Sequence, residues 1–246
     1  MVNLFSDQER RRYDRQILLP EWGIKGQKRI KEAKVFIAGA GGLGSPAAIY
    51  LAAAGVGTLR ICDDGEVEDS NLNRQILHGE SDVGKKKVFS AKRRLHEINP
   101  FVHVEALFRR IEPETIEALV GEAQIIVDCL DNLETRRLLN DYAVKKSLPL
   151  VYAAVYGLCG QLTFIHSPET PCLRCIFPGA PTRETFPVVG VTPGLLGVMQ
   201  ALEALKHIAG IGANLKGKLL IMDGEGMAFQ QVEVKKDPDC PVCASR

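Results

Sequence analysis

A glycine-rich turn follows the first apolar segment of the chain. Residues 35–38 are apolar and lead directly into Gly39, Gly41 and Gly44, which are spaced as G-x-G-x-x-G, with Gly42 inside the same turn. A strand that breaks into such a turn before a helix presents unpaired backbone N–H groups to a phosphate. The motif therefore predicts a nucleotide site, although a tight turn without a ligand is the alternative.

An acidic residue ends the next apolar segment, which covers residues 58–62. Asp63 follows Gly44 by 19 residues, where a carboxylate can accept hydrogen bonds from a ribose. The glycines and Asp63 together predict an adenosine nucleotide, but they fit NAD and ATP equally.

Polar and basic side chains are dense just beyond Asp63. The stretch 69–75 contains Ser70, Asn71, Asn73, Arg74 and Gln75, and three lysines, Lys85, Lys86 and Lys87, open a basic helix soon after. Arginine and lysine bind polyphosphate oxygens and neutralise charge that builds up in nucleotidyl transfer. A lysine run is usually a solvated face, but beside Arg74 and the glycine turn we expect at least one lysine to point inward.

A polar pair follows the expected buried strand 123–129. Asp131 and Asn132 stand where the carboxyl end of a buried strand would lie, which is where open α/β sheets bind ligands. A carboxylate there can hold Mg²⁺ against phosphates. The alternative is that either residue caps a helix beginning at Leu133, and one residue could do both.

Four of the seven cysteines form two C-x-x-C pairs. The pairs are Cys172 with Cys175 and Cys240 with Cys243, separated by 64 residues (240 − 175 − 1). Four thiolates complete a tetrahedral Zn²⁺ shell without an open position, so the pattern predicts a structural zinc site that the fold must assemble. Two unrelated pairs, or one redox dithiol, are the alternatives.

The other cysteines and the histidines suggest no chemistry. We expect Cys62, Cys129 and Cys159 to be small buried thiols, because each lies in an apolar, strand-like run. The histidines are scattered, and most fit surface or strand positions, so we expect no catalytic role for them; they are His78, His96, His103, His166 and His207.

Strands and helices alternate through the first two thirds of the chain. Ser6 and Glu9 form a capping-box pattern that predicts a first helix to about Gln16, and a second helix is expected at 26–33. The expected strands are 34–38, 58–62, 102–106, 123–129 and 150–154, and the main helices between them are 46–54, 85–98, 111–120 and 133–146. This alternation is typical of a parallel sheet covered on both faces.

The pattern changes after residue 160. Strands are expected at 161–166, 218–222 and 230–234 with few helices between them, which predicts an antiparallel extension. Residues 178–194 are rich in glycine and proline and predict a long loop. The apolar helix expected at 195–208 has too many outward apolar positions for a surface helix, so it belongs to the core or to a subunit interface. The fold class is thus α/β, a Rossmann-like, largely parallel sheet with an antiparallel C-terminal extension and a zinc corner.

Composition favours a soluble enzyme. The 246 residues are 46% hydrophobic and 25% charged, with a net charge of +1. That charge offers no electrostatic basis for bulk nucleic-acid or membrane binding. No apolar stretch approaches the roughly 20 residues that span a bilayer, and the N-terminus lacks a signal region, so we expect a cytoplasmic protein.

The motifs occur together in a characteristic order. Residues 12–16 (RYDRQ), the glycine turn, residues 70–75, the Asp131-Asn132 pair and both C-x-x-C pairs resemble the sulfur-carrier adenylyltransferases of molybdopterin and thiamine biosynthesis. These enzymes belong to the ubiquitin-activating-enzyme superfamily, and the resemblance spans residues 12–243. It implies a single ATP-binding activating-enzyme domain over 1–246, with N-terminal helices in 1–33, a nucleotide-binding part in 34–160 and a zinc-bound, carrier-binding part in 161–246.

The resemblance also implies a reaction and roles for residues. The C-terminal glycine carboxylate of a small ubiquitin-like carrier ending in Gly-Gly would attack the α-phosphate of ATP, releasing pyrophosphate and leaving an acyl-adenylate. Gly42 would back the phosphates, Asp63 would bind the ribose, and Asp131 would hold Mg²⁺. Asn71, Arg74 and Lys87 would contact the phosphates. Arg15 would reach into the active site of the partner in a homodimer. The implied catalytic residues are Arg15, Arg74, Lys87 and Asp131, and the implied nucleotide-binding residues are Gly39, Gly41, Gly42, Gly44, Asp63, Ser70, Asn71, Asn73, Arg74, Gln75, Lys87, Asp131 and Asn132.

Two positions depart from the family pattern. Phe186 stands where some members carry a cysteine that forms a thioester or persulfide, so we predict adenylation without a thioester on this loop and a separate persulfide donor. Leu130 replaces the usual threonine before Asp131, which we expect to be tolerated.

The sequence leaves three alternatives to this function: an NAD-dependent oxidoreductase, a non-catalytic ATP-binding relative, and an enzyme that adenylates another carboxylate. The carrier and its pathway cannot be predicted.

Overall fold

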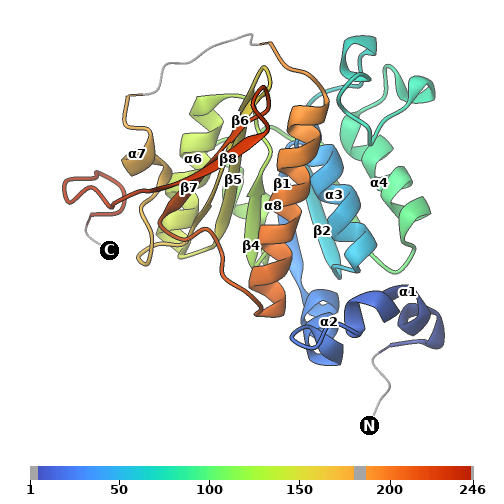
Figure 1. The fold of residues 1–246 in the computed structure, drawn as a ribbon. Coiled ribbons are helices and arrows are strands. Elements are labelled where there is room, and N and C mark those ends of the chain that lie inside the picture. The colour runs from blue at the N-terminus through green and yellow to red at the C-terminus, as the bar shows by residue number, and fades with distance from the viewer. Residues whose placement is uncertain (1–4, 180–186, 245–246) are drawn as a thin grey trace.

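One eight-stranded sheet forms the centre of the molecule. The computed structural model describes residues 5–179 and 187–244. The strand order is β3-β2-β1-β4-β5-β6-β7-β8 (Figure 1). The bounds are β1 Lys34–Ala38, β2 Thr58–Cys62, β3 His103–Leu107, β4 Ile125–Asp128, β5 Leu150–Tyr156, β6 Cys159–Ile165, β7 Lys218–Asp223 and β8 Ala228–Glu233. Strands β1 to β5 pair in parallel and β5 to β8 pair antiparallel, which confirms the predicted fold class.

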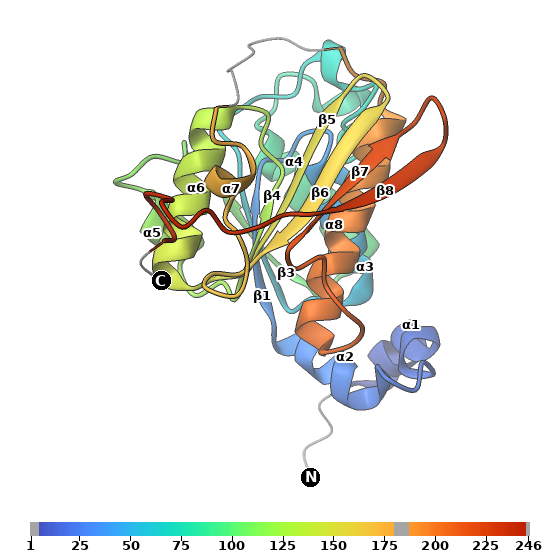
Figure 2. The same ribbon diagram turned by 60° about the vertical axis from the view of Figure 1, so that its left-hand side comes forward.

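Helices cover both faces of the sheet. Helices α3, α4 and α8 lie on one face, and α5 and α6 lie on the other (Figures 1 and 2). The bounds are α1 Asp7–Ile17, α2 Gly23–Glu32, α3 Gly44–Ala54, α4 Lys87–Ile98, α5 Ile116–Val120, α6 Leu133–Lys146, α7 Leu173–Ile176 and α8 Val191–Ala209, with 3-10 turns at Asp69–Asn71 and Glu80–Asp82.

Strand β1 shows how two cores arise from one sheet. Successive side chains of a strand point to opposite faces, so Val35 and Ile37 join the core under α3 and α8, whereas Phe36 and Ala38 join the core under α5 and α6. A strand buried on both faces must be apolar at every position, which is why residues 35–38 form a continuous apolar run.

The first helix is capped as predicted. The Ser6 hydroxyl accepts the Glu9 N–H at 3.2 Å, and the Glu9 carboxylate accepts the Ser6 N–H at 2.9 Å. Helices α1 and α2 lie together below the sheet, at the end of the molecule where β1 begins (Figure 1). Asn99 fixes α1 to the body by donating to the Tyr13 hydroxyl at 2.9 Å.

Two predicted boundaries are wrong. Helix α5 begins at Ile116 rather than near 111, because the Thr115 hydroxyl holds a turn by accepting the Glu112 N–H and donating to the Arg110 carbonyl, both at 2.9 Å. Helix α8 begins at Val191, so the end of the predicted loop at 178–194 is helical.

Helix α8 crosses the sheet beside α3. Its buried stripe includes Leu196, Gly197, Ala201 and Ala204, whereas Leu202 is 56% exposed, so the predicted apolar helix belongs to the core along one face only.

Within residues 5–179 and 187–244, no helix combines the length and apolarity that crossing a bilayer would require.

Candidate functional site

A cavity of about 690 Å³ opens at the carboxyl ends of the parallel strands. Of the residues predicted for the nucleotide site, those that line it are Gly39, Gly41, Gly42, Asp63, Arg74, Gln75, Lys87, Asp131 and Asn132. Four others, Gly44, Ser70, Asn71 and Asn73, do not line the cavity. The switch in strand order between β1 and β4 is where doubly wound sheets bind nucleotides.

The glycine turn can be built only from glycines at two points. Gly39 has φ of 98°, and a Cβ there would lie 2.7 Å from the Cys129 carbonyl oxygen. A Cβ on Gly44 would overlap the Gly39 carbonyl oxygen. Because these side chains are absent, the chain after β1 can pass close to the end of β4, and α3 can begin beside the cavity. The resulting helix N-terminus is suited to an anion.

Asp63 is anchored to the glycine turn. Its carboxylate accepts the Ala40 N–H at 2.8 Å through Oδ2 and the Gly65 N–H at 2.8 Å through Oδ1. These bonds orient the carboxylate at the cavity wall, and each oxygen retains a lone pair for a ribose hydroxyl.

Arg74 is held by the residues that precede it. Its Nη1 donates to the Ser70 carbonyl at 2.8 Å and to the Asn73 side chain at 3.0 Å. Ser70 and Asn73 therefore act by orienting Arg74 rather than by facing the cavity. Gln75 is 5% exposed and lines the cavity, and its Oε1 has no hydrogen-bond partner within the described residues.

The three lysines have different surroundings. Lys85 pairs with Asp82 at 3.5 Å, and the Lys86 ammonium lies 3.9 Å from the centroid of the Phe108 ring. Lys87 begins α4 and lines the cavity. One lysine of the run thus points inward, as expected.

Asp131 and Asn132 take separately the two roles that the sequence left open, cation binding and helix capping. The Asn132 side chain caps α6 by accepting the Thr135 N–H at 2.9 Å. Asp131 is exposed at the cavity, and within the described residues its carboxylate makes no hydrogen bond or ion pair. Asp131 is therefore available for a cation.

Sequence reasoning missed a buried ionic group beneath Asp131. Arg136 lines the cavity at 6% exposure, 3.6 Å from the carboxylate of fully buried Asp128. Burial raises the pKa of Asp128, and the Arg136 guanidinium opposes that rise. Arg136 lies one helical turn after Asn132, so helical spacing was the signal that could have found it. Arg109 and Arg110, which also line the cavity, follow no motif.

One prediction about a single residue is wrong, and one supporting residue was missed. Cys159 is exposed, because it opens β6 beside the β5–β6 turn, whereas Cys62 and Cys129 are buried as expected. His78 is a buried part of the site's support, since its ring nitrogens lie 3.0 Å from the Ala40 carbonyl and 3.0 Å from the Ser90 hydroxyl. Burial lowers the pKa of His78.

The cavity thiols are poor nucleophiles. Burial raises the pKa of Cys62 to about 12 and that of Cys129 well above its ordinary value. Both therefore stay protonated near neutral pH, so neither of them is a thiolate nucleophile at the cavity. Phe186, where some relatives carry a cysteine, lies outside the described residues.

The two C-x-x-C pairs meet beside α6. The four Sγ atoms lie within 4.8 Å of one another, with separations of 3.9 Å for Cys172–Cys175, 3.6 Å for Cys172–Cys240 and 3.4 Å for Cys175–Cys243. Zinc–sulfur bonds of about 2.3 Å give a tetrahedron with edges of about 3.8 Å, so the four thiols fit one zinc ion. Figure 2 shows the C-terminal segment returning from β8 toward α7 to complete this cluster.

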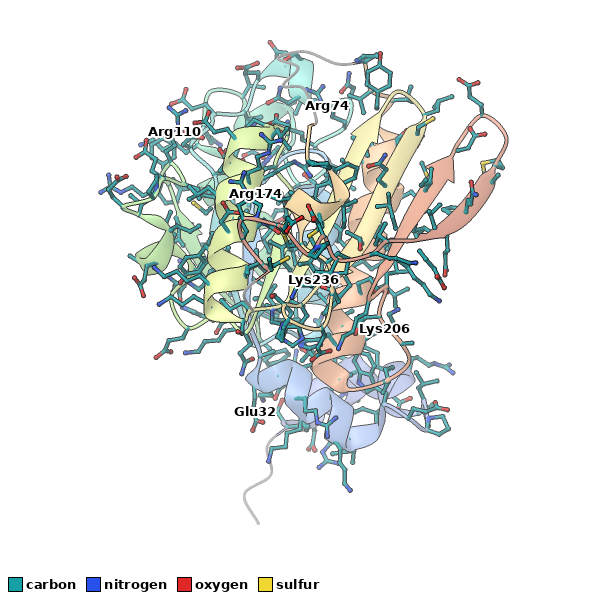
Figure 3. The ribbon with its side chains drawn as sticks, turned by 90° about the vertical axis from the view of Figure 1, so that its left-hand side faces the viewer. Glu32, Arg74, Arg110, Arg174, Lys206 and Lys236 are labelled. Atoms are coloured by element: carbon teal, nitrogen blue, oxygen red, sulfur yellow. The ribbon has the colours of Figure 1, made fainter. Side chains whose placement is uncertain are left out.

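Arg15 lies far from this cavity. It is exposed on α1, at the end of the molecule opposite the glycine turn (Figure 1). Figure 3 shows the same separation between Arg74, near the top of the view, and Glu32 of α2, near the bottom. A single chain therefore does not bring Arg15 to its own nucleotide site.

The fold and the cavity define a nucleotide-binding α/β protein of the doubly wound class, with an accompanying four-cysteine cluster. The ThiF family profile matches residues 13–242, and the chain belongs to this family.

Several named relatives match most of the chain. It is 44% identical to the SAMP-activating enzyme E1 of Haloferax volcanii, over 94% of this chain and 88% of that protein. It is 42% identical to the sulfur carrier protein adenylyltransferase of Thermus thermophilus, over 97% and 92%. It is 44% identical to the adenylyltransferase and sulfurtransferase MOCS3 of Mus musculus, but spans only 53% of that longer protein.

A solved structure confirms the fold. The structure of MccB from E. coli with ATP superposes with a TM-score of 0.83 at 26% identity, covering 94% of this chain and 74% of that chain.

Proposed function

We propose that this chain is an adenylyltransferase that uses ATP to activate the C-terminal glycine carboxylate of a small ubiquitin-like sulfur carrier. The observation that carries the proposal is the cavity, where the glycine turn, Arg74, Lys87 and an unpaired Asp131 face one another. The names of relatives 42–44% identical to this chain support the same activity.

The proposed reaction needs no general base. The carrier carboxylate is already an anion at neutral pH, so one of its oxygens can attack the α-phosphorus of ATP directly. A new P–O bond forms, the bond to the bridging oxygen breaks, and pyrophosphate leaves with that electron pair. The barrier is the approach of an anion to a polyanion, which fixed cations and exact positioning lower.

Each cavity residue has a role in that step. The glycine turn and the α3 N-terminus would support the phosphates, and Asp63 would accept hydrogen bonds from the ribose. Arg74 and Lys87 would offset the charge that develops on the transferred phosphate and pyrophosphate. Asp131 would hold Mg²⁺, whose charge screens the phosphates from the attacking carboxylate.

The far part of the cavity suits a peptide tail. Its wall includes Tyr156, Gln161, Phe177 and Val188, from β5, β6 and the segments flanking residues 180–186. These mainly apolar side chains, with one amide, could hold an extended C-terminal segment while its carboxylate points toward the nucleotide.

We propose a structural zinc ion at Cys172, Cys175, Cys240 and Cys243. A full thiolate shell leaves no position for substrate, so the metal would supply stability only. The cluster joins the C-terminal tail to α7, which is itself fixed to α6 because the Leu173 N–H donates to the Asn140 side chain at 2.8 Å.

Homodimer formation and sulfur transfer complete the proposal. The position of α1, far from the cavity of its own chain, supports a role for Arg15 in the nucleotide site of another copy. No buried cavity thiol is suited to attack the adenylate, so a separate persulfide donor would supply the sulfur. An NAD-dependent oxidoreductase gains no support from the relatives named above.

The test is ATP–pyrophosphate exchange with candidate carriers ending in Gly-Gly. Exchange should require the carrier and should be lost in Arg74→Ala and Asp131→Ala proteins that melt at the wild-type temperature. Absence of exchange with every carrier encoded nearby would reject the proposal in favour of a non-catalytic ATP-binding protein or another acceptor.

A further inference from the structure

Strands β4 and β5 diverge at the cavity. They pair in parallel as far as Asp128 opposite Tyr152. Beyond that point β5 continues to Tyr156, whereas the chain after β4 turns away into residues 129–132 and α6. Backbone carbonyls at such a divergence need other donors, because a buried carbonyl without a partner is costly.

Arg136 joins the two strand ends from the α6 side. Its guanidinium donates to the Leu130 carbonyl and, at 2.6 Å, to the Ala153 carbonyl. The same group lies 4.9 Å from the centroid of the Tyr152 ring. A planar guanidinium can donate in two directions at once, which a lysine ammonium on a flexible stem does poorly.

Gln200 joins them from the opposite face. It projects from α8, is fully buried, and its Nε2 donates to the Asp128 carbonyl at 2.7 Å and the Val151 carbonyl at 3.0 Å. The carbonyls bound by Gln200 precede those bound by Arg136 by two residues on each strand. The two side chains therefore brace the same divergence at successive points.

This bracing fixes both neighbours of Asp131. The Arg136 side chain holds the Leu130 carbonyl. The Asn132 side chain caps helix α6, which carries Arg136, and the Arg136 backbone N–H donates to the Asn132 carbonyl at 3.3 Å. The Asp131 carboxylate itself is exposed and has no such support. Its position thus depends on the backbone that the first turn of α6 and Arg136 hold.

We infer that Arg136 and Gln200 are positioning residues that hold Asp131 at the place where it meets magnesium-bound ATP. The inference rests on the proposed role of Asp131. It assigns the two side chains no contact with substrate, because each is engaged with the protein itself. Arg136 binds two backbone carbonyls and pairs with Asp128, and Gln200 binds two carbonyls and accepts from the Cys129 thiol. Misplacement of about 1 Å at a reacting centre can cost orders of magnitude, so this bracing matters beyond stability.

The test compares nucleotide binding with and without metal. Arg136→Lys keeps a cation beside Asp128 but cannot span the Leu130 and Ala153 carbonyls. We expect the Kd for ATP with Mg²⁺, measured by calorimetry, to rise about tenfold, and the Kd for ATP in EDTA to change less than twofold. Arg137→Lys is the matched control, because among the described residues the adjacent Arg137 donates a single long bond, 3.5 Å, to the Pro178 carbonyl. It should change neither constant.

A second variant covers the case in which Arg136→Lys does not fold. Gln200→Met keeps the length of the side chain and removes both of its bonds, so it should show the same metal-selective loss. Equal weakening of both constants would mean general damage and would overturn the inference, as would no change in either. In an Asp131→Asn background, Arg136→Lys should add no further metal-selective loss, and an added loss would also contradict the inference.

The binding assay separates this inference from the proposed function. It requires no carrier, so failure of pyrophosphate exchange with every carrier would reject the proposed function without affecting the binding result. Carrier-dependent exchange together with unselective binding changes would retain the function and reject the positioning role.

Discussion

Single residues in this molecule act largely through the backbone they orient. Asp63 is fixed by two N–H groups, Arg74 by the Ser70 carbonyl, and Asp131 has a capped helix beside it. The spacing of the glycines and of Asp63 made this part of the site predictable. His78 was not predictable as support, because one of its partners is the carbonyl of a distant segment that no local pattern reveals. Arg136 carried a weak signal, its spacing of one helical turn from Asn132.

Gly44→Ala should remove nucleotide binding. The added methyl group would overlap the Gly39 carbonyl oxygen, so the turn must open or α3 must shift. Overpacking of a tight site typically costs about 1–3 kcal/mol. We expect a lower Tm and no detectable ATP binding by calorimetry.

Gly194→Ala is the control for that substitution. Gly194 lies in the first turn of α8 and has open space where a Cβ would stand. Alanine favours a helix over glycine, so Tm should stay the same or rise. A Gly44→Ala protein that binds ATP as well as this control would show that the turn does not constrain the site.

Asp82 should make stability depend on pH in acid. Burial would raise its pKa, but hydrogen bonds from the Gly79 N–H, Ser90 and Arg93 outweigh burial and lower the pKa to about 2. The carboxylate therefore stabilises the fold fully above its ordinary pKa of 3.8, and this contribution is lost as pH falls toward 2.

Asp82→Asn measures that contribution. The variant should be about 1–2 kcal/mol less stable than wild type at pH 7, less than the full shift implies because Arg93 is half exposed and screened by solvent. In urea unfolding, the difference should shrink between pH 4 and pH 2. Glu80→Gln, a neighbouring exposed carboxylate, should show no such trend, and a constant Asp82→Asn deficit down to pH 2 would contradict the assignment.

At the scale of elements, the cysteine cluster ties the C-terminal tail to the rest of the fold. Cys243→Ser should lower bound zinc, measured by atomic emission, to well below one ion per chain, and should lower Tm, because metal binding contributes directly to folding. Pyrophosphate exchange should fall only in proportion to the folded fraction. Cys159→Ser is the control, since this exposed thiol lies outside the cluster.

Full zinc loading of the Cys243→Ser protein would refute the four-thiolate site. Exchange lost completely at a temperature where the variant remains folded would instead show that the cluster contributes to chemistry.

The elements themselves were mostly predictable. Strands buried on both faces are apolar at each position, and the α1 cap follows a local pattern, so β1, β4 and α1 lie close to their predicted places. The start of α5 differs because a threonine side chain supports a turn in place of helix. Helix α8 starts early because its first turn packs on the glycine turn, with Pro193 against Gly42, a tertiary contact that composition does not show.

At the scale of the whole molecule, the distance between α1 and the cavity makes a testable case for a second copy. If Arg15 acts in the partner's site, Arg15→Ala and Asp131→Ala proteins should each be inactive alone. Mixed as subunit-exchanged dimers, they should recover up to about a quarter of wild-type exchange activity, because a mixed dimer has one intact site and about half of the dimers are mixed.

A failure to recover activity would be informative only with proof that the two variants had exchanged subunits. Mixed dimers should be isolated by two different affinity tags before assay. A mixed dimer without activity would show that Arg15 and Asp131 serve the same copy, whereas an Arg15→Ala protein that is active alone would show that Arg15 has no catalytic role.

The most direct test of the central claim is the intact mass of the carrier after one turnover. With ATP, Mg²⁺ and the enzyme, a carrier ending in Gly-Gly should gain the mass of one adenylyl group (AMP less one water), which fragmentation places on its C-terminal glycine. A carrier lacking that glycine, and the Asp131→Ala enzyme, should give no adduct. An AMP adduct on a side chain or on the enzyme, or no adduct on any candidate carrier, would contradict the account.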